Sequence, residues 1–147
     1  MPDYYELSVD KFTFRIESGC FYNEEGMWAR PEGEYVHMGL SDYTQQRSGD
    51  VAFIELKPVG THLAFGDEAA VIETIKVNII LGSPVSGEVV AVNSALEVSP
   101  EIVNQDPYGE GWMLVMKPVD WASDRPRLLD GRAYFERVKK QVEEETR

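Results

Sequence analysis

The most distinctive chemical group in this sequence is a single lysine, Lys76, within an apolar run that favours β-structure. The run reads AVIETIKVNIILGSPVSGE over residues 70–88, and Ile75 and Val77 flank the lysine. An exposed strand lysine is the simpler interpretation. A lysine at the tip between two strands has a second use, because its amine on a long flexible stem is open to acylation. Such a lysine would carry a swinging cofactor arm, for example lipoamide.

The residues around Lys76 do not form a familiar hairpin turn. The segment TIKVN, residues 74–78, contains neither Asn-Gly nor Asp-Gly, the pairs that favour a two-residue connection. If Lys76 lies at a hairpin tip, the residues of this tip are there for a reason other than favourable turn formation.

Other reactive side chains are few. His37 and His62 are far apart and have no Cys or His neighbour at ligand spacing, so a metal site is not supported. Cys20 is the single cysteine, which rules out a disulfide within the chain. We interpret Cys20 as a small buried residue beside Phe21, in preference to a redox relay. The sequence has no phosphate-binding loop, and the GEG at 109–111 is typical of a turn.

Length and charge limit the class of protein. The 147 residues suggest one domain, or one domain with an appendage. The net charge of −12 argues against a nucleic-acid partner, and it suits either plain solubility or partners with basic docking faces. No stretch is long and apolar enough to span a membrane, and the N-terminus lacks the pattern of a secretory signal. We therefore expect a cytoplasmic monomer.

The elements that must position Lys76 are mostly short strands. Alternating apolar residues, separated by Gly- and Pro-containing turns, are typical of a sandwich or small barrel. The predicted strands cover residues 11–17, 34–40, 50–56, 68–76, 77–81, 87–93 and 111–118. Helix signals are clearest over 131–147, and shorter helices are predicted over 41–47, with Ser41 or Asp42 as the cap, and within 94–104.

Several longer motifs follow one another in a specific order. They are GLSDYTQ (39–45), SGDVAFIEL (48–56), ETIK (73–76), SPVSGEVVAVNSAL (83–96), VNQDPYGEGWMLVMKP (103–118) and LLDGRAY (128–134). In this order and spacing the chain resembles the H protein of the glycine cleavage system, a lipoyl carrier, over about residues 22–135. Residues 1–21 would then be an N-terminal extension packed on or near the domain of residues 22–147.

The resemblance implies a fold, a cofactor and a set of partners. The fold is mainly β, a lipoyl-domain-like barrel-sandwich hybrid with a C-terminal helix and one or two short helices. Lipoate would be attached as an amide to Lys76, and the attaching enzyme, a lipoate ligase or lipoyl transferase, would read Glu73 and Gly60. The protein itself would be a carrier without catalytic residues. Its partners would be the pyridoxal-phosphate glycine decarboxylase, the aminomethyltransferase and dihydrolipoyl dehydrogenase.

The chain also departs from the family pattern. Gly26 and Met27 replace a His-Glu pair between the retained Tyr22 and Trp28, and VNII follows Lys76 where small and polar residues are usual. These changes favour a second role, as a lipoate-binding sulfur carrier of a heterodisulfide-reductase-like complex, because dithiols exchange readily with persulfides. We therefore expect poor replacement of a glycine-cleaving H protein. A non-lipoylated binding module is a third alternative, and Lys76, Glu73 and Gly60 argue against it.

Overall fold

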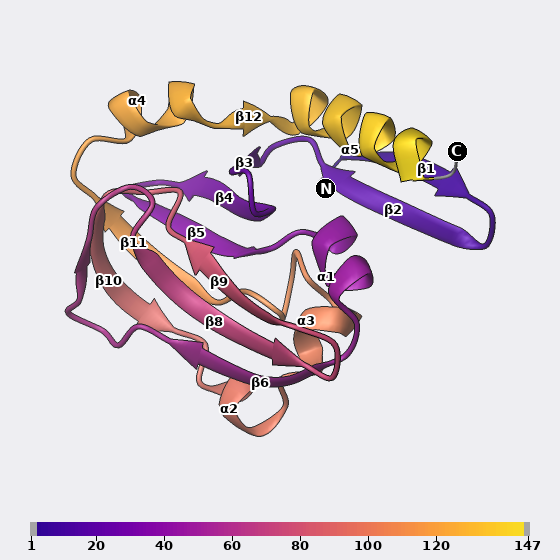
Figure 1. Cartoon of the computed structure of the whole chain (residues 1–147). Coiled ribbons are helices and arrows are strands. Elements are labelled where there is room, and N and C mark those ends of the chain that lie inside the picture. The colour runs from indigo at the N-terminus through magenta and orange to yellow at the C-terminus, as the bar shows by residue number, and fades with distance from the viewer. Residues whose placement is uncertain (1–2, 146–147) are drawn as a thin grey trace.

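The computed structural model describes residues 3–145 as a mainly β structure with a helix at its C-terminal end (Figure 1). The strands are β1 (Tyr4–Val9), β2 (Phe12–Glu17), β3 (Phe21–Tyr22), β4 (Met27–Glu32), β5 (Tyr35–Leu40), β6 (Val51–Leu56), β7 (His62–Leu63), β8 (Glu68–Thr74), β9 (Asn78–Gly82), β10 (Gly87–Val92), β11 (Leu114–Pro118) and β12 (Leu129–Asp130). The helices are α1 (Asp42–Ser48), α2 (Ala95–Val98), α3 (Ile102–Gln105), α4 (Trp121–Asp124), the short 3-10 turn η1 (Arg125–Arg127) and α5 (Gly131–Glu145).

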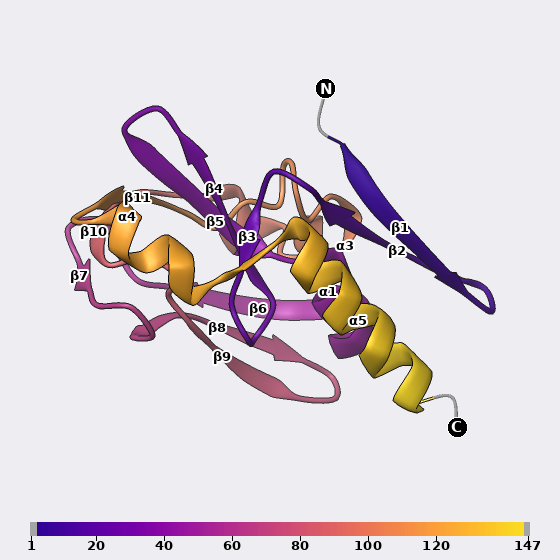
Figure 2. The ribbon, with the colours of Figure 1, turned by 90° about the horizontal axis from the view of Figure 1, so that it is seen from above.

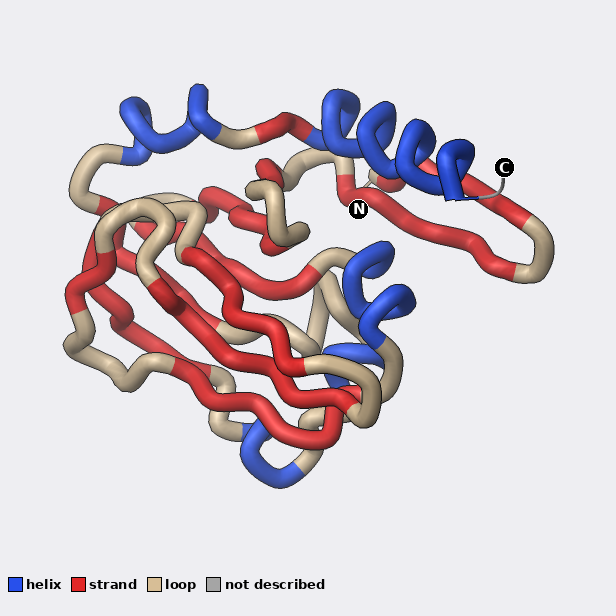
Figure 3. The backbone as a smooth tube through the Cα atoms, viewed as in Figure 1, coloured by secondary structure: helices blue, strands red, loops and turns tan. Residues whose placement is uncertain are grey.

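The strands form two antiparallel sheets and a separate hairpin. One sheet has seven strands in the order β12-β3-β4-β5-β11-β10-β7, the other has three in the order β6-β8-β9, and β1 pairs with β2. Both sheets are open, and no closed barrel forms among residues 3–145. Figure 3 shows the three-stranded sheet as one layer of long strands whose connections lie at its two ends. The predicted fold class, mainly β with a C-terminal helix and short helices, is confirmed.

The main core lies between the two sheets. Leu40 of β5 and Val89 of β10 come from the seven-stranded sheet, and Ile54 of β6 and Ile72 of β8 come from the three-stranded sheet. Ile54 and Ile72 alternate with exposed or half-buried neighbours along their strands, as a half-buried antiparallel sheet requires. This core fixes the orientation of the β8–β9 hairpin, whose turn contains Lys76.

A second core joins the N-terminal hairpin to α5. Figure 2 shows α5 beside the β1–β2 hairpin, and Phe14, Ile16, Tyr134 and Val138 are buried in one cluster there. The rings of Tyr22 and Tyr134 stack with their centroids 4.1 Å apart. Figure 1 shows that the β8–β9 turn lies at the edge of the molecule, on the side where α1 leads into β6.

Two retained family residues meet in this second core. The indole Nε1 of Trp28 donates a hydrogen bond to the carbonyl of Pro107 at 3.0 Å. Its ring lies directly over Gly39, since a Cβ added at Gly39 would lie 2.5 Å from Trp28 Cζ2. The glycine of the GLSDYTQ motif is therefore required by the tryptophan on the neighbouring strand.

Each of the seven predicted strand segments contains a strand, and each predicted helix contains a helix. The last two residues of the predicted 131–147 helix lie outside the described residues. The sequence pattern does not predict the remaining elements β1, β3, β4, β7, β12, α3 and α4. Ser41 is the N-cap of α1, where its side chain accepts a hydrogen bond from the Thr44 amide.

Candidate functional site

The turn between β8 and β9 presents Lys76. Cα pairing in this hairpin ends at Glu73 opposite Asn78, and the Thr74 amide donates a hydrogen bond to the Val77 carbonyl at 2.9 Å. Ile75 and Lys76 are therefore the two residues that reverse the chain, and both side chains are exposed. Ile75 is 94% exposed, so this tip is not covered by the rest of the described chain.

The Thr74 side chain closes this turn. Its Oγ1 accepts hydrogen bonds from the amides of Lys76 at 3.2 Å and Val77 at 3.1 Å, and its hydroxyl donates to the Val77 carbonyl at 3.1 Å. Ile75 and Lys76 both have negative φ angles, whereas the favoured two-residue hairpin turns need positive ones. A local hydroxyl therefore replaces Asn-Gly chemistry. In the sequence, this type of turn is indicated by Thr74, the residue immediately before the two tip residues.

The Lys76 amine has no acidic partner in the part of the chain that the structure describes. No salt bridge among residues 3–145 includes it. Its aliphatic stem runs beside the end of α1, where Cε would lie 3.9 Å from a Cβ added at Gly49. An exposed primary amine on a well-defined turn is well placed to meet an acylating enzyme.

Glu73 is exposed and lies on the outer face of the three-stranded sheet. Its Cα pairs with Asn78 on β9 and with Phe53 on β6. Directly opposed residues of antiparallel strands lie on the same face, with Cβ atoms about 5 Å apart. The carboxylate of Glu73 and the half-exposed ring of Phe53 are therefore neighbours on the surface beside the Lys76 turn.

Gly60 lies at the other end of β6, in the segment that leads to β7. Its φ angle is +94°, a conformation that side chains of L-residues rarely adopt, and its amide donates a hydrogen bond to the Val89 carbonyl at 2.8 Å. A Cβ added there would meet no atom within 4 Å. Glu73 thus lies on the hairpin that presents Lys76, whereas Gly60 lies beyond the end of β6 that is away from the Lys76 turn.

The two replaced family positions offer no polar side chain near Lys76. Gly26 has a φ angle of +87° and packs against α1, where an added Cβ would lie 2.0 Å from Thr44 Oγ1. Met27 is fully buried in the main core. A His-Glu pair at these positions would require different packing of α1 and β4.

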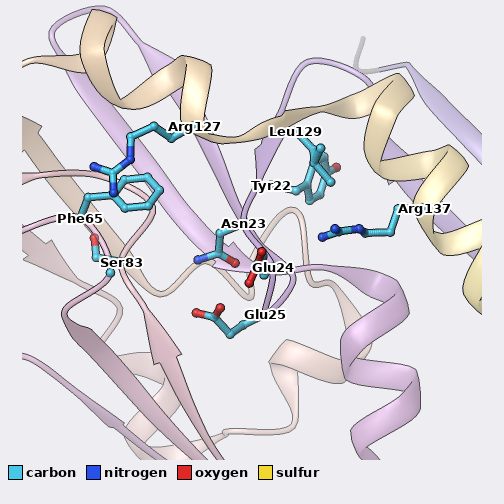
Figure 4. Close-up of a pocket in the computed structure, with 10 residues that line it drawn as sticks. Tyr22, Asn23, Glu24, Glu25, Phe65, Ser83, Arg127, Leu129 and Arg137 are labelled. Carbon is cyan, nitrogen blue, oxygen red and sulfur yellow. The ribbon is translucent and has the colours of Figure 1, made fainter.

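A pocket of about 370 Å³ lies between the β3–β4 connection, the β7–β8 connection, η1 and α5 (Figure 4). Glu25 is at its edge, where Oε1 accepts a hydrogen bond from the Gly82 amide at 3.0 Å. Arg127 lies over the Phe65 ring at 3.7 Å from its centroid, and Arg137 points inward from α5. No local motif indicates Glu25, because its contact with Gly82 of β9 joins residues 57 positions apart.

Cys20 is buried away from this surface. Its thiol donates a hydrogen bond to Glu17 Oε2, and the same oxygen lies 3.2 Å from Nη1 of Arg30. Burial, together with the Glu17 carboxylate, raises the pKa of the Cys20 thiol above its ordinary value. A protonated and inaccessible thiol is a poor nucleophile, so Cys20 packs as a structural residue.

No group of three or more His, Cys, Asp or Glu residues within 3–145 is arranged to hold a metal ion. His37 Nε2 lies 3.2 Å from Glu32 Oε2 at the exposed end of the β4–β5 hairpin. None of the helices between residues 3 and 145 is long and apolar enough to cross a membrane.

Known proteins resemble this chain over most of its length. The family model described as "Glycine cleavage H-protein" matches residues 20–141, which leaves the whole of β1 and β2 outside the match. A "Glycine cleavage system H protein" of Thermus thermophilus is 46% identical over 121 residues, covering 82% of this chain and 94% of that protein. A "Probable glycine cleavage system H protein" of Thermococcus kodakarensis is 39% identical over 129 residues, covering 87% and 96%.

A solved structure is similar as well. The crystal structure of a glycine cleavage system H protein from Mycobacterium marinum superposes with a TM-score of 0.75 at 26% identity, covering 83% of this chain and 98% of that one. The family match covers more than half of the chain and agrees with relatives that match over nearly their full length. This chain belongs to the glycine cleavage H-protein family.

Proposed function

We propose that this protein is a lipoyl carrier and that Lys76 is the residue to which lipoate is attached as an amide. The observation that carries the proposal is the exposed amine of Lys76 in a two-residue turn whose backbone is held by Thr74. Lys76 is suited to carry a lipoyl group, since its amine is unpaired among residues 3–145. An attaching enzyme can reach this amine without rearrangement of the side chain. When bound, the lipoyl group supplies a dithiol that accepts and releases a cargo at sulfur.

The role of the polypeptide is to present the arm, because the partner enzymes supply the chemistry. In the proposed role those partners are the glycine decarboxylase, the aminomethyltransferase and dihydrolipoyl dehydrogenase, in agreement with the glycine cleavage names of the relatives. Glu73 and Gly60 are proposed as the residues that the lipoate-attaching enzyme reads. The cytoplasmic location, the monomeric state and the boundary at residues 21 and 22 stay predictions from the sequence.

Glu25 is proposed as the acidic group that attracts a cationic amine as cargo, since it lines the pocket beside β3 and α5. Thr44 Oγ1 donates a hydrogen bond to the Glu25 carbonyl at 3.5 Å, while the Lys76 stem lies beside Gly49. The Glu25 carboxylate itself accepts a hydrogen bond from the Gly82 amide, at the end of β9 away from the Lys76 turn, and it provides an acidic group that the Gly26 and Met27 positions do not.

A sulfur-carrying role is the second candidate. Two features favour the sulfur-carrying role. Met27 is buried, and Ile80, on the strand after Lys76, is 62% exposed. Both differ from the polar residues that are usual around the lysine in the family. In that role the partner is an iron–sulfur and flavin complex of the heterodisulfide-reductase type. A non-lipoylated binding module is disfavoured because it would need neither the accessible Lys76 nor the neighbouring Glu73.

Glycine–bicarbonate exchange tests the proposed role. The lipoylated chain is compared with an established H protein in the presence of glycine decarboxylase, and free lipoate sets the lower limit. Exchange close to that of the H protein supports glycine cleavage. Exchange near the free-lipoate rate, together with persulfide loading of the reduced protein, refutes it in favour of sulfur transport. The sequence departures predict an exchange rate below that of the H protein but above that of free lipoate, and Glu25→Gln should lower this rate further if the carboxylate attracts the cargo.

A further inference from the structure

The surface along β6 has the character of a docking site. A groove of about 650 Å³ runs between β6 and α2, and Phe53 and Val59 line it from β6 and the following segment. Val98 of α2 lines the opposite side and is 86% exposed. Phe53 and Val59 are 52% and 58% exposed, so three large apolar side chains are open to solvent around one groove.

The groove connects the two residues proposed for recognition. Phe53 is the Cα partner of Glu73, three residues before Lys76, and Val59 immediately precedes Gly60. Between Phe53 and Leu56 the strand advances about 10 Å, and the chain continues through Pro58 to Gly60. An enzyme that reads both Glu73 and Gly60 must therefore cover the β6 side of this groove.

Charge indicates which partner suits this surface. Glu55 and Glu97 line the groove, and Glu73 extends the acidic rim toward Lys76. A second copy of this chain, with its net charge of −12, would bring like charges together. A partner with apolar groups flanked by lysine or arginine is complementary.

We infer that the groove along β6, with Phe53 and Val59 as its apolar anchors, is the docking site for the lipoate-attaching enzyme. This inference rests on the proposed function of Lys76. Recognition of Glu73 and Gly60 then has a simple geometric basis, because they lie at the two ends of one continuous footprint. The anchors contribute binding and not chemistry, since neither side chain is at the acylated amine.

The test uses the full-length apo chain and a lipoate ligase that loads it. Phe53→Ser and Val59→Ser are compared with Val119→Ser, whose side chain is 80% exposed in the connection between β11 and α4. Two quantities are measured: the Kd for the ligase without ATP, and the KM and kcat for addition of the lipoyl mass. We expect each groove variant to raise Kd and KM about tenfold, with kcat nearly unchanged. Val119→Ser should match the wild type.

A charge variant gives an independent readout. Glu55→Lys should weaken ligase binding and make the remaining affinity less dependent on salt, because a complementary charge is lost. Thermal midpoints of all variants should stay close to the wild type, since the substituted side chains are exposed.

Different failures have different signatures. If wild-type protein is loaded at Lys76 but the groove variants keep wild-type Kd and KM, the docking inference is wrong and the carrier function stands. If Phe53→Ser changes the oligomeric state in sedimentation and leaves ligase binding intact, the groove is a self-interface and the inference is wrong. If the wild-type chain acquires no lipoyl group, both the carrier function and the docking site are refuted.

Discussion

Replacing Thr74 by valine should loosen the turn that presents Lys76. The Thr74 hydroxyl holds two backbone amides, those of Lys76 and Val77, and also donates to the Val77 carbonyl. Valine has nearly the same shape but has no hydroxyl, so it removes these three interactions with little change in volume. The hydrogen bond from the Thr74 amide to the Val77 carbonyl, at 2.9 Å, remains.

The expected effect is local. An ordinary hydrogen bond contributes about 1 kcal/mol net, and exposed ones contribute less because water replaces them. The three interactions together should therefore stabilise the closed turn by about 1–2 kcal/mol. Since 1.4 kcal/mol corresponds to tenfold, amide exchange at Lys76 and Val77 should accelerate about 5- to 30-fold. The global thermal midpoint should change little, because the main core is not touched.

Hydrogen exchange followed by NMR measures this change, and Thr74→Ser is the matched control. Serine keeps the hydroxyl, so its exchange rates should stay near those of the wild type. Lipoylation of the valine variant should slow about two- to tenfold, since a disordered turn presents the amine in many orientations. If the amides of Lys76 and Val77 exchange in Thr74→Val at the same rates as in the wild type, the role assigned to this hydroxyl is refuted.

Further predictions concern other parts of the site and the fold. Gly39→Ala should destabilise the protein by about 1–3 kcal/mol in urea unfolding, because the added Cβ lies 2.5 Å from a Trp28 ring atom, whereas Gly19→Ala should be neutral since nothing lies within 4 Å. Burial raises the pKa of Cys20 and of Tyr22. The contribution of these two groups to the free energy of unfolding is complete below their ordinary pKa values of 9.0 and 10.0, and it is lost as the pH rises above those values. The urea midpoint should therefore fall in alkali. A midpoint that stays constant there would show that both groups have their ordinary pKa values in the folded protein. Glu73→Ala should slow lipoylation with an unchanged thermal midpoint, and a lower midpoint at an unchanged rate per folded molecule would make Glu73 structural.

The strands that the sequence predicts are those whose pattern is local. The alternation of Phe12, Phe14 and Ile16 predicts β2, and the apolar runs at β8, β9 and β10 likewise predict strands. β4 was missed because Pro31 and the following glycine suggest a turn, yet its residues pair with β5 over six positions. α4 was missed because four residues carry little periodicity, and its Asp120 cap is the main signal.

The residues of the candidate site also differ in whether a local pattern in the sequence indicates them. Lys76 and Glu73 lie three residues apart on one hairpin, so a local motif suffices to find them. Phe53 becomes part of the site only through the pairing of β6 with β8, and Glu25 only through its contact with Gly82. Such contacts depend on tertiary register, which no single sequence window contains.

The most direct test of the carrier proposal is the mass and position of the modification. Apo protein is incubated with its cognate lipoate-attaching enzyme, lipoate and ATP, and then analysed by intact mass and peptide mapping. The proposal predicts one lipoyl group, located on Lys76, and no gain in mass for Lys76→Arg, which keeps the charge but lacks the primary amine. A lipoyl group on another lysine, or an unmodified wild-type chain after treatment with the cognate enzyme, would contradict it.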